Sequence, residues 1–389
     1  MITKGPCAHK GRRGDRTHAR AIGEPAQRYA CAAGQSGGAR RAGGVRARTW
    51  NAPEHPDTGA FEVTVEVITL GESLVALIAE SVGSLAEATR FERHVVGAES
   101  NVAVGLVRLG HSVGYVGRVG GDAFGTAILR RLRGEGVNVD WLRADPEAPT
   151  GLLIRERQPL GPSEVLYRRA GSAGSRLSPD DVSAAEAAGL FATARWLHIT
   201  GITPALSASA AAAVSTAVDA ARAASLIISL DINLRRKLWS DEVAAPVLRR
   251  LAADVDVIFG GDDEAAVVTG ARPGVEAAQL AEALLDLGPR LAVVKLGAQG
   301  ALALERGSLP VLRPALAVPS VVDPVGAGDA FCAGFIAARL EGSDVAAALA
   351  MGNACGAAAV SALGDLTGLP ERAALDRLLA ATATDDTLR

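Results

Sequence analysis

The sequence has little cysteine, little aromatic content and no long apolar run. Its 389 residues include only four cysteines, none in a CxxC pair, which excludes a disulfide scaffold, a standard zinc site and a redox dithiol and predicts a reducing, cytoplasmic environment. The most apolar stretch, 205–230, is interrupted by Asp219 and Arg222, so we expect no membrane span. No secretory leader is expected, because residues 1–60 lack the apolar segment that such a leader needs. No GxGxxG turn follows the first predicted strand, which disfavours a dehydrogenase.

Charge is distributed unevenly along the chain. Residues 1–60 carry eleven Lys or Arg against four Asp or Glu, a net charge of +7, whereas residues 61–389 carry a net charge of −10. The basic segment has no apolar periodicity, so we predict that it is a disordered extension, either a nucleic-acid-binding arm or a segment without a role. The acidic remainder argues against nucleic-acid binding by the folded part.

Short apolar strands alternate with helical patterns over residues 61–389. Strands are predicted at 61–71, 113–119, 195–199, 226–231, 256–259 and 291–296, and helices at 100–110, 122–134, 179–191, 205–224, 241–252, 274–287, 329–341, 344–360 and 370–381. The alternation predicts an α/β fold with a mostly parallel sheet and an active site at the carboxyl ends of its strands. Strand pairs within about 74–96 and 151–169 have no helix between them and predict a small β-sheet lid.

The segment 321–334, VVDPVGAGDAFCAG, carries the clearest chemical signal. A short apolar strand is followed by the Gly326-Ala327-Gly328 turn, and Asp329 then opens a predicted helix. Such a turn directs several backbone N–H groups to one point at a helix N-terminus, where an anion such as phosphate binds. A carboxylate beside that point is placed to accept a proton from an attacking hydroxyl. The alternative is that Asp329 only caps the helix.

With this segment the sequence resembles the ribokinase-like (PfkB-type) carbohydrate kinases over about 61–375. A second matching motif is the Gly-rich turn that leads into an Asn-containing helix, from Gly97 to Gly110. The resemblance implies a ribokinase-like, Rossmann-type three-layer sandwich over 61–389. It also implies that Asp329 is the catalytic base and that the N–H groups of Gly326, Ala327 and Gly328 form the anion hole for the γ-phosphoryl group. ATP and Mg²⁺ are the implied cofactors, with a possible K⁺ or other monovalent cation near Asp323 and Val325.

The resemblance extends to a nucleotide-binding region. Lys295, Gly297 and Gly300 match a KxGxxG turn after a strand, although a strand-end lysine in a hairpin turn would give the same pattern. Glu264 keeps the acid of an NxxE motif whose Asn is replaced by Gly261, and the alternative is a solvated acid in a first helical turn. Asn353 matches a helix start that borders the adenine pocket, or is an ordinary helical Asn.

The residues that bind the substrate are predicted from strand ends and from two segments, 167–173 and 229–235, which look like the 2-keto-3-deoxygluconate kinase branch of the family. The candidate substrate-binding residues are Glu72, Gly97, Asn101, Tyr167, Arg168 and Arg235. A sugar acid carries a carboxylate, which a guanidinium binds in a bidentate fork, and this favours Arg235 and Arg168. Arg169 is the alternative to Arg168. For Arg168 and Arg235 the alternative interpretation is that both are exposed strand-end residues.

These observations predict an enzyme that phosphorylates a hydroxyl of a sugar or sugar acid with ATP, with 2-keto-3-deoxygluconate as the expected substrate and its 6-phosphate as the product. The alternatives are a neutral-sugar kinase of the fructokinase or ribokinase type, or a non-catalytic sugar or nucleotide sensor on the same fold. The expected partners are small molecules only, without nucleic acid or membrane, and the resemblance suggests a homodimer formed through the lid sheets.

Overall fold

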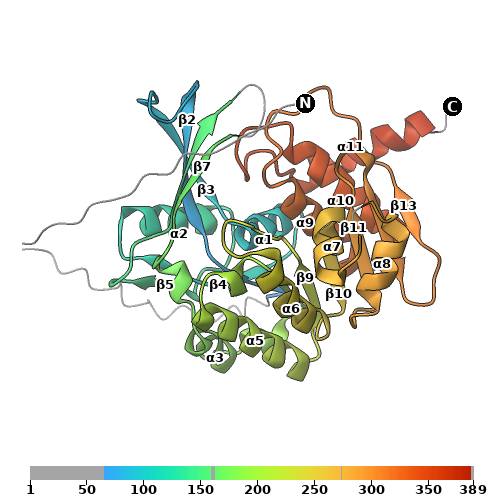
Figure 1. Ribbon diagram of the computed structural model, residues 1–389, viewed down its shortest axis with the longest axis horizontal. Coiled ribbons are helices and arrows are strands. Elements are labelled where there is room, and N and C mark those ends of the chain that lie inside the picture. Colours follow the sequence, from blue (N-terminus) through green and yellow to red (C-terminus); the bar gives the residue numbers. More distant parts are fainter. Residues whose placement is uncertain (1–64, 159–162, 273, 387–389) are drawn as a thin grey trace, which may run out of the picture. The chain divides into compact units, whose positions relative to one another are not determined.

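The strands of the large sheet lie in the order β13-β12-β11-β10-β9-β8-β1-β4-β5 in the computed structural model of the protein (Figure 1). The structure describes residues 65–158, 163–272 and 274–386. Neighbouring strands pair in parallel from β11 through to β5, and β12 and β13 extend one edge as antiparallel strands. The strands are β1 (Val67–Gly71), β4 (Val113–Gly120), β5 (Leu142–Asp145), β8 (Trp196–Thr200), β9 (Ile227–Asp231), β10 (Val257–Gly261), β11 (Leu291–Lys295), β12 (Ala301–Glu305) and β13 (Val311–Arg313).

The central strands are buried along almost their whole length, as in β1 and β8, where every residue is buried. Their apolar residues are nearly continuous rather than alternating, because both faces of a parallel sheet are covered. Val67 and Tyr115 belong to the hydrophobic core on one face, and Ile68 and Val116 belong to the core on the other.

Helices cover both faces of the sheet, which confirms the predicted three-layer α/β sandwich. One face packs against α1 (Ala98–Arg108), α2 (Ala123–Gly134), α9 (Ala327–Leu340), α10 (Val345–Ala359) and α11 (Arg372–Asp386). The other face packs against α3 (Pro179–Ala187), α4 (Leu190–Thr193), α5 (Ala208–Ala223), α6 (Asp241–Ala252), α7 (Asp262–Thr269) and α8 (Ala277–Leu285).

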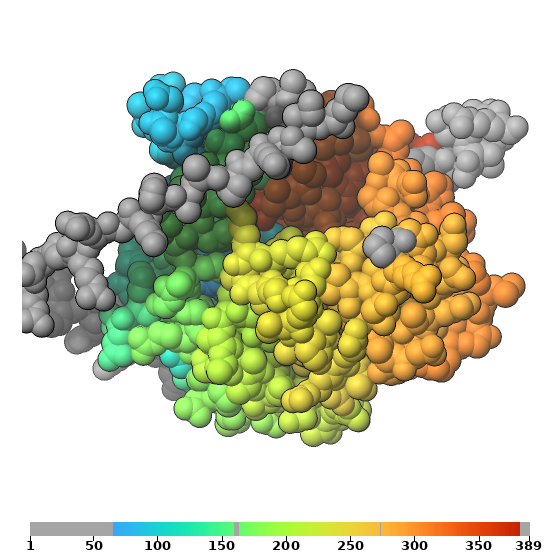
Figure 2. All heavy atoms as spheres, viewed as in Figure 1, coloured from blue at the N-terminus to red at the C-terminus, as the bar shows by residue number. Residues whose placement is uncertain are grey.

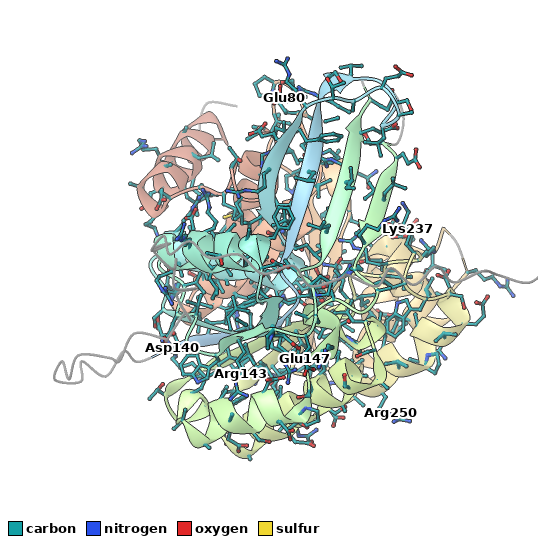
Figure 3. The ribbon with its side chains drawn as sticks, turned by 90° about the vertical axis from the view of Figure 1, so that its left-hand side faces the viewer. Glu80, Asp140, Arg143, Glu147, Lys237 and Arg250 are labelled. Atoms are coloured by element: carbon teal, nitrogen blue, oxygen red, sulfur yellow. The ribbon has the colours of Figure 1, made fainter. Side chains whose placement is uncertain are left out.

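A second sheet has the strand order β3-β2-β6-β7, which confirms the predicted small sheet. Its strands are β2 (Leu74–Val82), β3 (Phe91–Val96), β6 (Leu152–Arg157) and β7 (Val165–Arg168), with β2 and β6 parallel and the other pairs antiparallel. Figure 3 shows these strands side by side, with Glu80 near the end that points away from the large sheet. Lys237 Nζ, from the loop after β9, donates a hydrogen bond of 2.8 Å to the Val165 carbonyl and so joins this lid sheet to the rest of the domain.

Several element boundaries differ from the predictions, each for a local reason. The predicted helix 179–191 is two helices, because Gly189 adopts a left-handed φ of 85° between them. Helix α9 begins at Ala327 rather than at residue 329, because Gly326 with a φ of 81° occupies the N-cap position. The sequence does not predict β5, β12, β13 or α7. β5 and β13 are short and partly exposed, and β12 is rich in Ala, which has a low strand propensity.

Some predictions concern segments that the structure does not describe. The basic extension at 1–60 and the start of the first predicted strand, 61–64, lie outside the described residues. Within the described part of the chain, no helix combines the length and apolarity that a membrane span requires. Cys332 and Cys355 are buried free thiols.

Candidate active site

Polar side chains lie at the carboxyl ends of four of five neighbouring strands of the large sheet, and a glycine ends the fifth. Glu72 follows β1, and Thr200, Asp231, Gly261 and Lys295 are the last residues of β8, β9, β10 and β11. The carboxyl ends of parallel strands meet at one edge of a sheet, so these residues lie along one line. This is the edge at which the sequence predicts the active site.

A cavity of about 440 Å³ opens between this edge and the lid sheet. Figure 2 shows the surface hollowed between the blue lid strands and the orange residues of the C-terminal part. Leu74, Leu153 and Tyr167 reach the cavity from the lid. The predicted site residues that line it are Glu72, Gly97, Tyr167, Arg235, Glu264, Lys295, Val325, Gly326, Gly328 and Asp329.

The first turn of α9 presents its backbone N–H groups beside this cavity. The N–H groups of a first helical turn have no acceptor within the helix and stay available to an anion. Glycine is required at position 326 because of its left-handed backbone, and because a Cβ there would lie 3.2 Å from the Asp365 Cα atom. Gly326, Ala327 and Gly328 thus form a tight turn at the start of α9, at the place where the sequence predicts an anion-binding turn.

Asp329 is buried in that same first turn. Its Oδ2 accepts a hydrogen bond of 2.8 Å from Asn101 Nδ2, and its Oδ1 accepts a bond of 3.3 Å from Asn233 Nδ2. Burial, reinforced by the negative charge of Asp231, raises the pKa of Asp329 to about 7, although the Asn101 hydrogen bond acts in the opposite direction. The carboxyl group is therefore suited to exchange a proton near neutral pH.

Asn101, which the sequence predicts to bind substrate, is held against two carboxyl groups and is not among the residues that line the cavity. It lies in α1, and its Nδ2 also donates a hydrogen bond of 3.0 Å to Asp365 Oδ2. Burial raises the pKa of Asp365, which lines the cavity. The sequence does not predict Asp365, because no recognised pattern surrounds it in the loop after α10.

Lys295 places a positive charge next to the anion-binding turn. Its Nζ donates to both oxygens of the buried Asp231, at 2.8 and 2.9 Å. Burial is the largest single effect and disfavours the charged form of Lys295, but the charge and hydrogen bond of Asp231 together with the nearby Cys332 and Glu264 outweigh it and raise the pKa of Lys295, so the ammonium stays protonated. A Cβ added to Gly328 would lie 3.3 Å from this Nζ, which shows how close the ammonium is to the turn.

Glu264 supports two backbone segments at the edge of the cavity. Its Oε1 accepts from the Leu234 N–H at 2.8 Å, and its Oε2 accepts from the Gly261 N–H at 2.8 Å. The second bond caps the start of α7, because Glu264 at the third helical position accepts from the backbone N–H of the N-cap residue Gly261. Burial raises the pKa of Glu264, so it is not a solvated surface acid.

Glu72 is bound by an arginine of the lid loop. Arg169 donates to Glu72 Oε2 from Nε at 2.8 Å and from Nη2 at 2.5 Å, and the Ser172 hydroxyl donates to Oε1. Arg168 is exposed, donates to the carbonyl of Tyr167 and does not line the cavity. Of the two neighbouring arginines, the structure thus brings Arg169 to the site and not Arg168.

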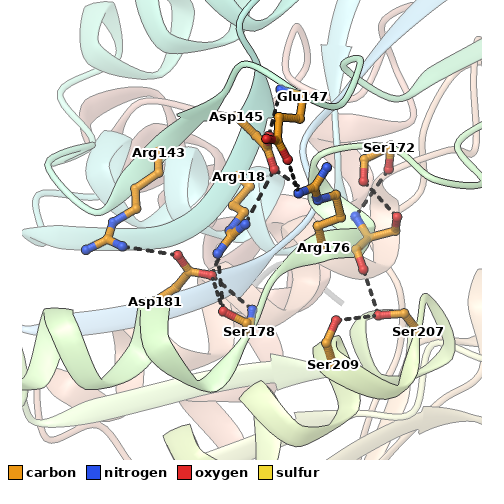
Figure 4. A network of polar contacts seen from close by, with 11 residues as sticks. Arg118, Arg143, Asp145, Glu147, Ser172, Arg176, Ser178, Asp181, Ser207 and Ser209 are labelled. Carbon is orange, nitrogen blue, oxygen red and sulfur yellow. Dashed lines mark hydrogen bonds and ion pairs between the residues drawn. The ribbon is translucent and has the colours of Figure 1, made fainter.

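A polar network holds the segment that carries Arg169 and Ser172 (Figure 4). The backbone N–H and the hydroxyl of Ser175 donate hydrogen bonds to the hydroxyl and the carbonyl oxygen of Ser172. The carbonyl of Ser175 in turn accepts a hydrogen bond of 2.6 Å from the Ser207 hydroxyl. Nearby, Arg118 bridges Asp145 at 3.4 Å and Asp181 at 2.8 Å, which fixes the ends of β4 and β5 against α3. The serine contacts hold the segment next to Arg169, which lines the cavity.

Arg235 offers a cation to the cavity. Its side chain is exposed and lines the cavity, and its charge lowers the pKa of Asp329 against the larger effect of burial. Among the residues that the structure describes, its guanidinium has no hydrogen-bonding side chain as partner, whereas Lys295 and Arg169 are paired with Asp231 and Glu72. Arg235 is therefore the lining cation that is available to an anionic ligand.

Glu99, in the first turn of α1, is a further buried acid of the cavity that the sequence does not single out. Its Oε1 accepts from the hydroxyls of Thr200 at 2.7 Å and Thr203 at 2.5 Å. Its Oε2 is buried and has no partner among the described residues. Burial raises the pKa of Glu99. The threonines are distant in sequence, so only the fold reveals this acid as part of the site.

The structure does not bring three predicted nucleotide residues to the cavity itself. Asn353 donates through Nδ2 to the carbonyls of Arg313 and Pro314, each at 3.0 Å, and so holds the end of β13. Gly297 and Gly300 form the tight turn between β11 and β12, where a Cβ at position 300 would lie 2.1 Å from the Arg313 carbonyl oxygen. These residues position the turn that follows Lys295.

The carboxylate of Asp323 does not fit the role of a cation ligand, because its oxygens are already engaged. Arg155, in the lid strand β6, donates from Nη1 to Oδ1 at 3.1 Å and from Nη2 to Oδ2 at 2.5 Å. The N–H groups of Val325 and Gly364 donate to the same oxygens at 3.2 and 3.3 Å. The predicted monovalent-cation site is therefore not supported at this carboxylate.

The chain resembles known proteins along most of its length. The family model of the pfkB family carbohydrate kinases matches residues 65–372. The chain is 38% identical to a 2-dehydro-3-deoxygluconokinase of Bacillus subtilis (strain 168), over 82% of this chain and 97% of the relative, and 39% identical to one of Thermoproteus tenax, over 82% and 96%. It is 32% identical to a fructokinase of Klebsiella pneumoniae, over 81% and 99%.

Solved structures of similar fold include ligand complexes. A PfkB protein from Polaromonas sp. JS666 is 35% identical with a TM-score of 0.71, over 80% of this chain and 99% of that one. A ribokinase II from E. coli in complex with ATP and Mg²⁺ is 25% identical with a TM-score of 0.73, over 82% and 99%. A fructokinase from Vibrio cholerae O395 with bound fructose, ADP and potassium is 28% identical with a TM-score of 0.71, over 81% and 98%.

Proposed function

The chain belongs to the pfkB family of carbohydrate kinases, and we propose that it transfers the γ-phosphoryl group of ATP to the 6-hydroxyl of 2-keto-3-deoxygluconate, also called 2-dehydro-3-deoxygluconate. The observation that carries the proposal is the meeting of Asp329, the first turn of α9 and Lys295 at one cavity. A base, an anion hole and a fixed cation are parts that phosphoryl transfer uses.

In the proposed reaction, a carboxylate oxygen of Asp329 accepts the proton of the substrate hydroxyl. The hydroxyl oxygen bonds to the γ-phosphorus while the bond from that phosphorus to the bridging oxygen of ADP breaks, and the bonding electron pair leaves with ADP. The N–H groups of Gly326, Ala327 and Gly328 bind the oxygens of the transferred group, and the Lys295 ammonium beside Gly328 adds a positive charge. The lid excludes water and so favours transfer to the sugar over hydrolysis.

The sugar acid is proposed from the relatives and from Arg235. Two of the compared relatives are named 2-dehydro-3-deoxygluconokinase. Arg235 supplies a cation that a substrate carboxylate can pair with, while Tyr167, Glu72 and Gly97 border the same space. The similarity to fructokinase keeps a neutral-sugar kinase as the second candidate. A non-catalytic sensor would not need the buried base of raised pKa.

Mg²⁺ is proposed to bind mainly through the phosphate oxygens of ATP, whose negative charge it neutralises. The described residues contain no cluster of three His, Cys, Asp or Glu side chains arranged to hold a metal ion. Glu264 has both carboxylate oxygens engaged by backbone N–H groups and acts on the site by fixing the chain around Leu234 and Gly261.

The rate should depend on pH through Asp329. The proposed base works in its ionised form, and burial raises its pKa to about 7 in the free protein. We therefore expect kcat/KM to fall about tenfold for each pH unit below pH 7 and to level off above it. Steady-state rates with 2-keto-3-deoxygluconate and ATP between pH 5 and 9 provide the measurement. If kcat/KM does not change across pH 7, or falls as the pH rises through 7, Asp329 is not the base.

Assembly and domain limits remain proposals as well. We propose that residues 61–389 form the kinase domain and 1–60 an extension of it, in a cytoplasmic enzyme.

Two copies are proposed to pair through their lid sheets, since β3 and β7 are edge strands of the described lid and Val82 is 60% exposed on it. Light scattering at micromolar concentration gives the mass in solution, and a monomer would refute the pairing.

A further inference from the structure

The contact between Arg155 and Asp323 joins the lid to the loop that leads into the anion-binding turn. Arg155 lies in β6, and Asp323 stands three residues before Gly326. The two terminal guanidinium nitrogens of Arg155 each donate to a different carboxylate oxygen of Asp323, which is the bidentate geometry of a strong ion pair. The Arg155 side chain is 13% exposed and that of Asp323 is 5% exposed, so the pair is shielded from water.

Asp323 organises the two loops that surround the turn. Its Oδ1 accepts from the Val325 N–H in the loop entering α9, and its Oδ2 accepts from the Gly364 N–H in the loop that carries Asp365. A carboxylate offers about four acceptor positions, and the two Arg155 bonds together with these two amides use all four. A nearby positive charge stabilises a buried carboxylate, and Arg155 places one against Asp323.

We propose that Arg155 is a positioning residue that supplies, from within the chain, the positive charge that a monovalent cation would otherwise supply at Asp323. This inference rests on the proposed kinase function. Turnover should then not require K⁺.

The position of Arg155 also links the lid to the turn. Residues two apart in a strand face the same side, and Leu153, two residues before Arg155, lines the cavity. The side of β6 that covers the substrate therefore also carries the charge that holds Asp323. The Arg155 side chain therefore couples the position of the lid to the order of the turn at 326–328, which is proposed to bind phosphate.

The test compares turnover in K⁺ with turnover in tetramethylammonium at constant ionic strength. For the parent protein we expect kcat to be nearly the same in the two salts. Arg155→Met removes the charge but keeps a chain of similar length, and kcat should fall about tenfold to 100-fold, the loss of hydrogen bonds to a charged group. K⁺ should restore part of that loss, and Arg155→Lys should retain more activity than Arg155→Met. Arg157→Met, at the exposed end of the same strand, is the matched control and should behave as the parent.

Thermal unfolding gives a readout that does not depend on activity. K⁺ should raise the Tm of Arg155→Met relative to tetramethylammonium and leave the Tm of the parent unchanged. The proposal is overturned by a parent that needs K⁺ for turnover, or by an Arg155→Met variant whose Tm and activity are the same in both salts. If the parent phosphorylates no sugar, the kinase function fails while the Tm comparison still decides the role of Arg155.

Discussion

Asp329→Asn should lower kcat by about 10²- to 10⁴-fold, the contribution of a general base. The substitution keeps the size of the side chain, and its amide oxygen can still accept the hydrogen bond from Asn101. The Tm should not fall, because burial near Asp231 and Asp365 already favours the neutral form of this carboxyl group and raises its pKa. A loss of rate without a loss of stability would assign the effect to proton transfer.

Asp344→Asn is the matched control for that variant. Asp344 is the N-cap of α10, and its Oδ1 accepts from the Ala347 N–H at 2.7 Å, a bond that Asn makes equally well. It does not line the cavity, so kcat should stay at the parent value. Initial rates at saturating ATP and sugar acid measure both variants. An Asp329→Asn variant as fast as Asp344→Asn would refute the proposed base.

Arg235→Gln should remove the preference for a sugar acid. Hydrogen bonds to charged groups contribute about 1.5–3 kcal/mol each, so kcat/KM for 2-keto-3-deoxygluconate should fall about tenfold to 100-fold. Fructose has no carboxylate, and its kcat/KM should change little. We expect this fall in kcat/KM because Arg235 lines the cavity and has no carboxylate partner among the described residues, whereas Arg169 is paired with Glu72.

Arg236→Gln provides the comparison for Arg235→Gln. Arg236 is the next residue, and it pairs with Asp241 at 2.9 Å and Asp263 at 3.3 Å away from the cavity. Its loss should leave the ratio of kcat/KM for the two sugars unchanged. Equal losses for fructose and for the sugar acid in Arg235→Gln would show that Arg235 does not contact a substrate carboxylate.

The parts of the site that lie in one continuous segment are those that the sequence predicts. The turn at 326–328 and Asp329 follow one another in the chain, and the turn chemistry of Gly326 is local. Lys295 and Arg235 are also predicted, since Lys295 ends a recognisable strand and Arg235 lies shortly after one. The alternation of strands and helices is also a local pattern in the chain, and it predicts the layers of the fold.

The remaining parts depend on contacts between distant segments. Arg155 meets Asp323 across 168 residues, and Asn101 meets Asp365 across 264 residues, so neither pairing leaves a local pattern. Glu99 becomes part of the site only because β8 places Thr200 against it. The choice between Arg168 and Arg169 also depends on the fold, because the pleat of β7 and the loop after it decide which side chain faces Glu72.

The most direct test of the account is the kcat/KM of the unmodified protein for 2-keto-3-deoxygluconate, fructose and ribose, followed by ADP formation in the presence of ATP and Mg²⁺. Contact between a charged side chain and the substrate carboxylate predicts that the sugar acid is preferred by at least about tenfold. A preference for fructose or ribose would contradict the proposed substrate while keeping the kinase. An absence of ADP formation with all three sugars would contradict the proposed function itself.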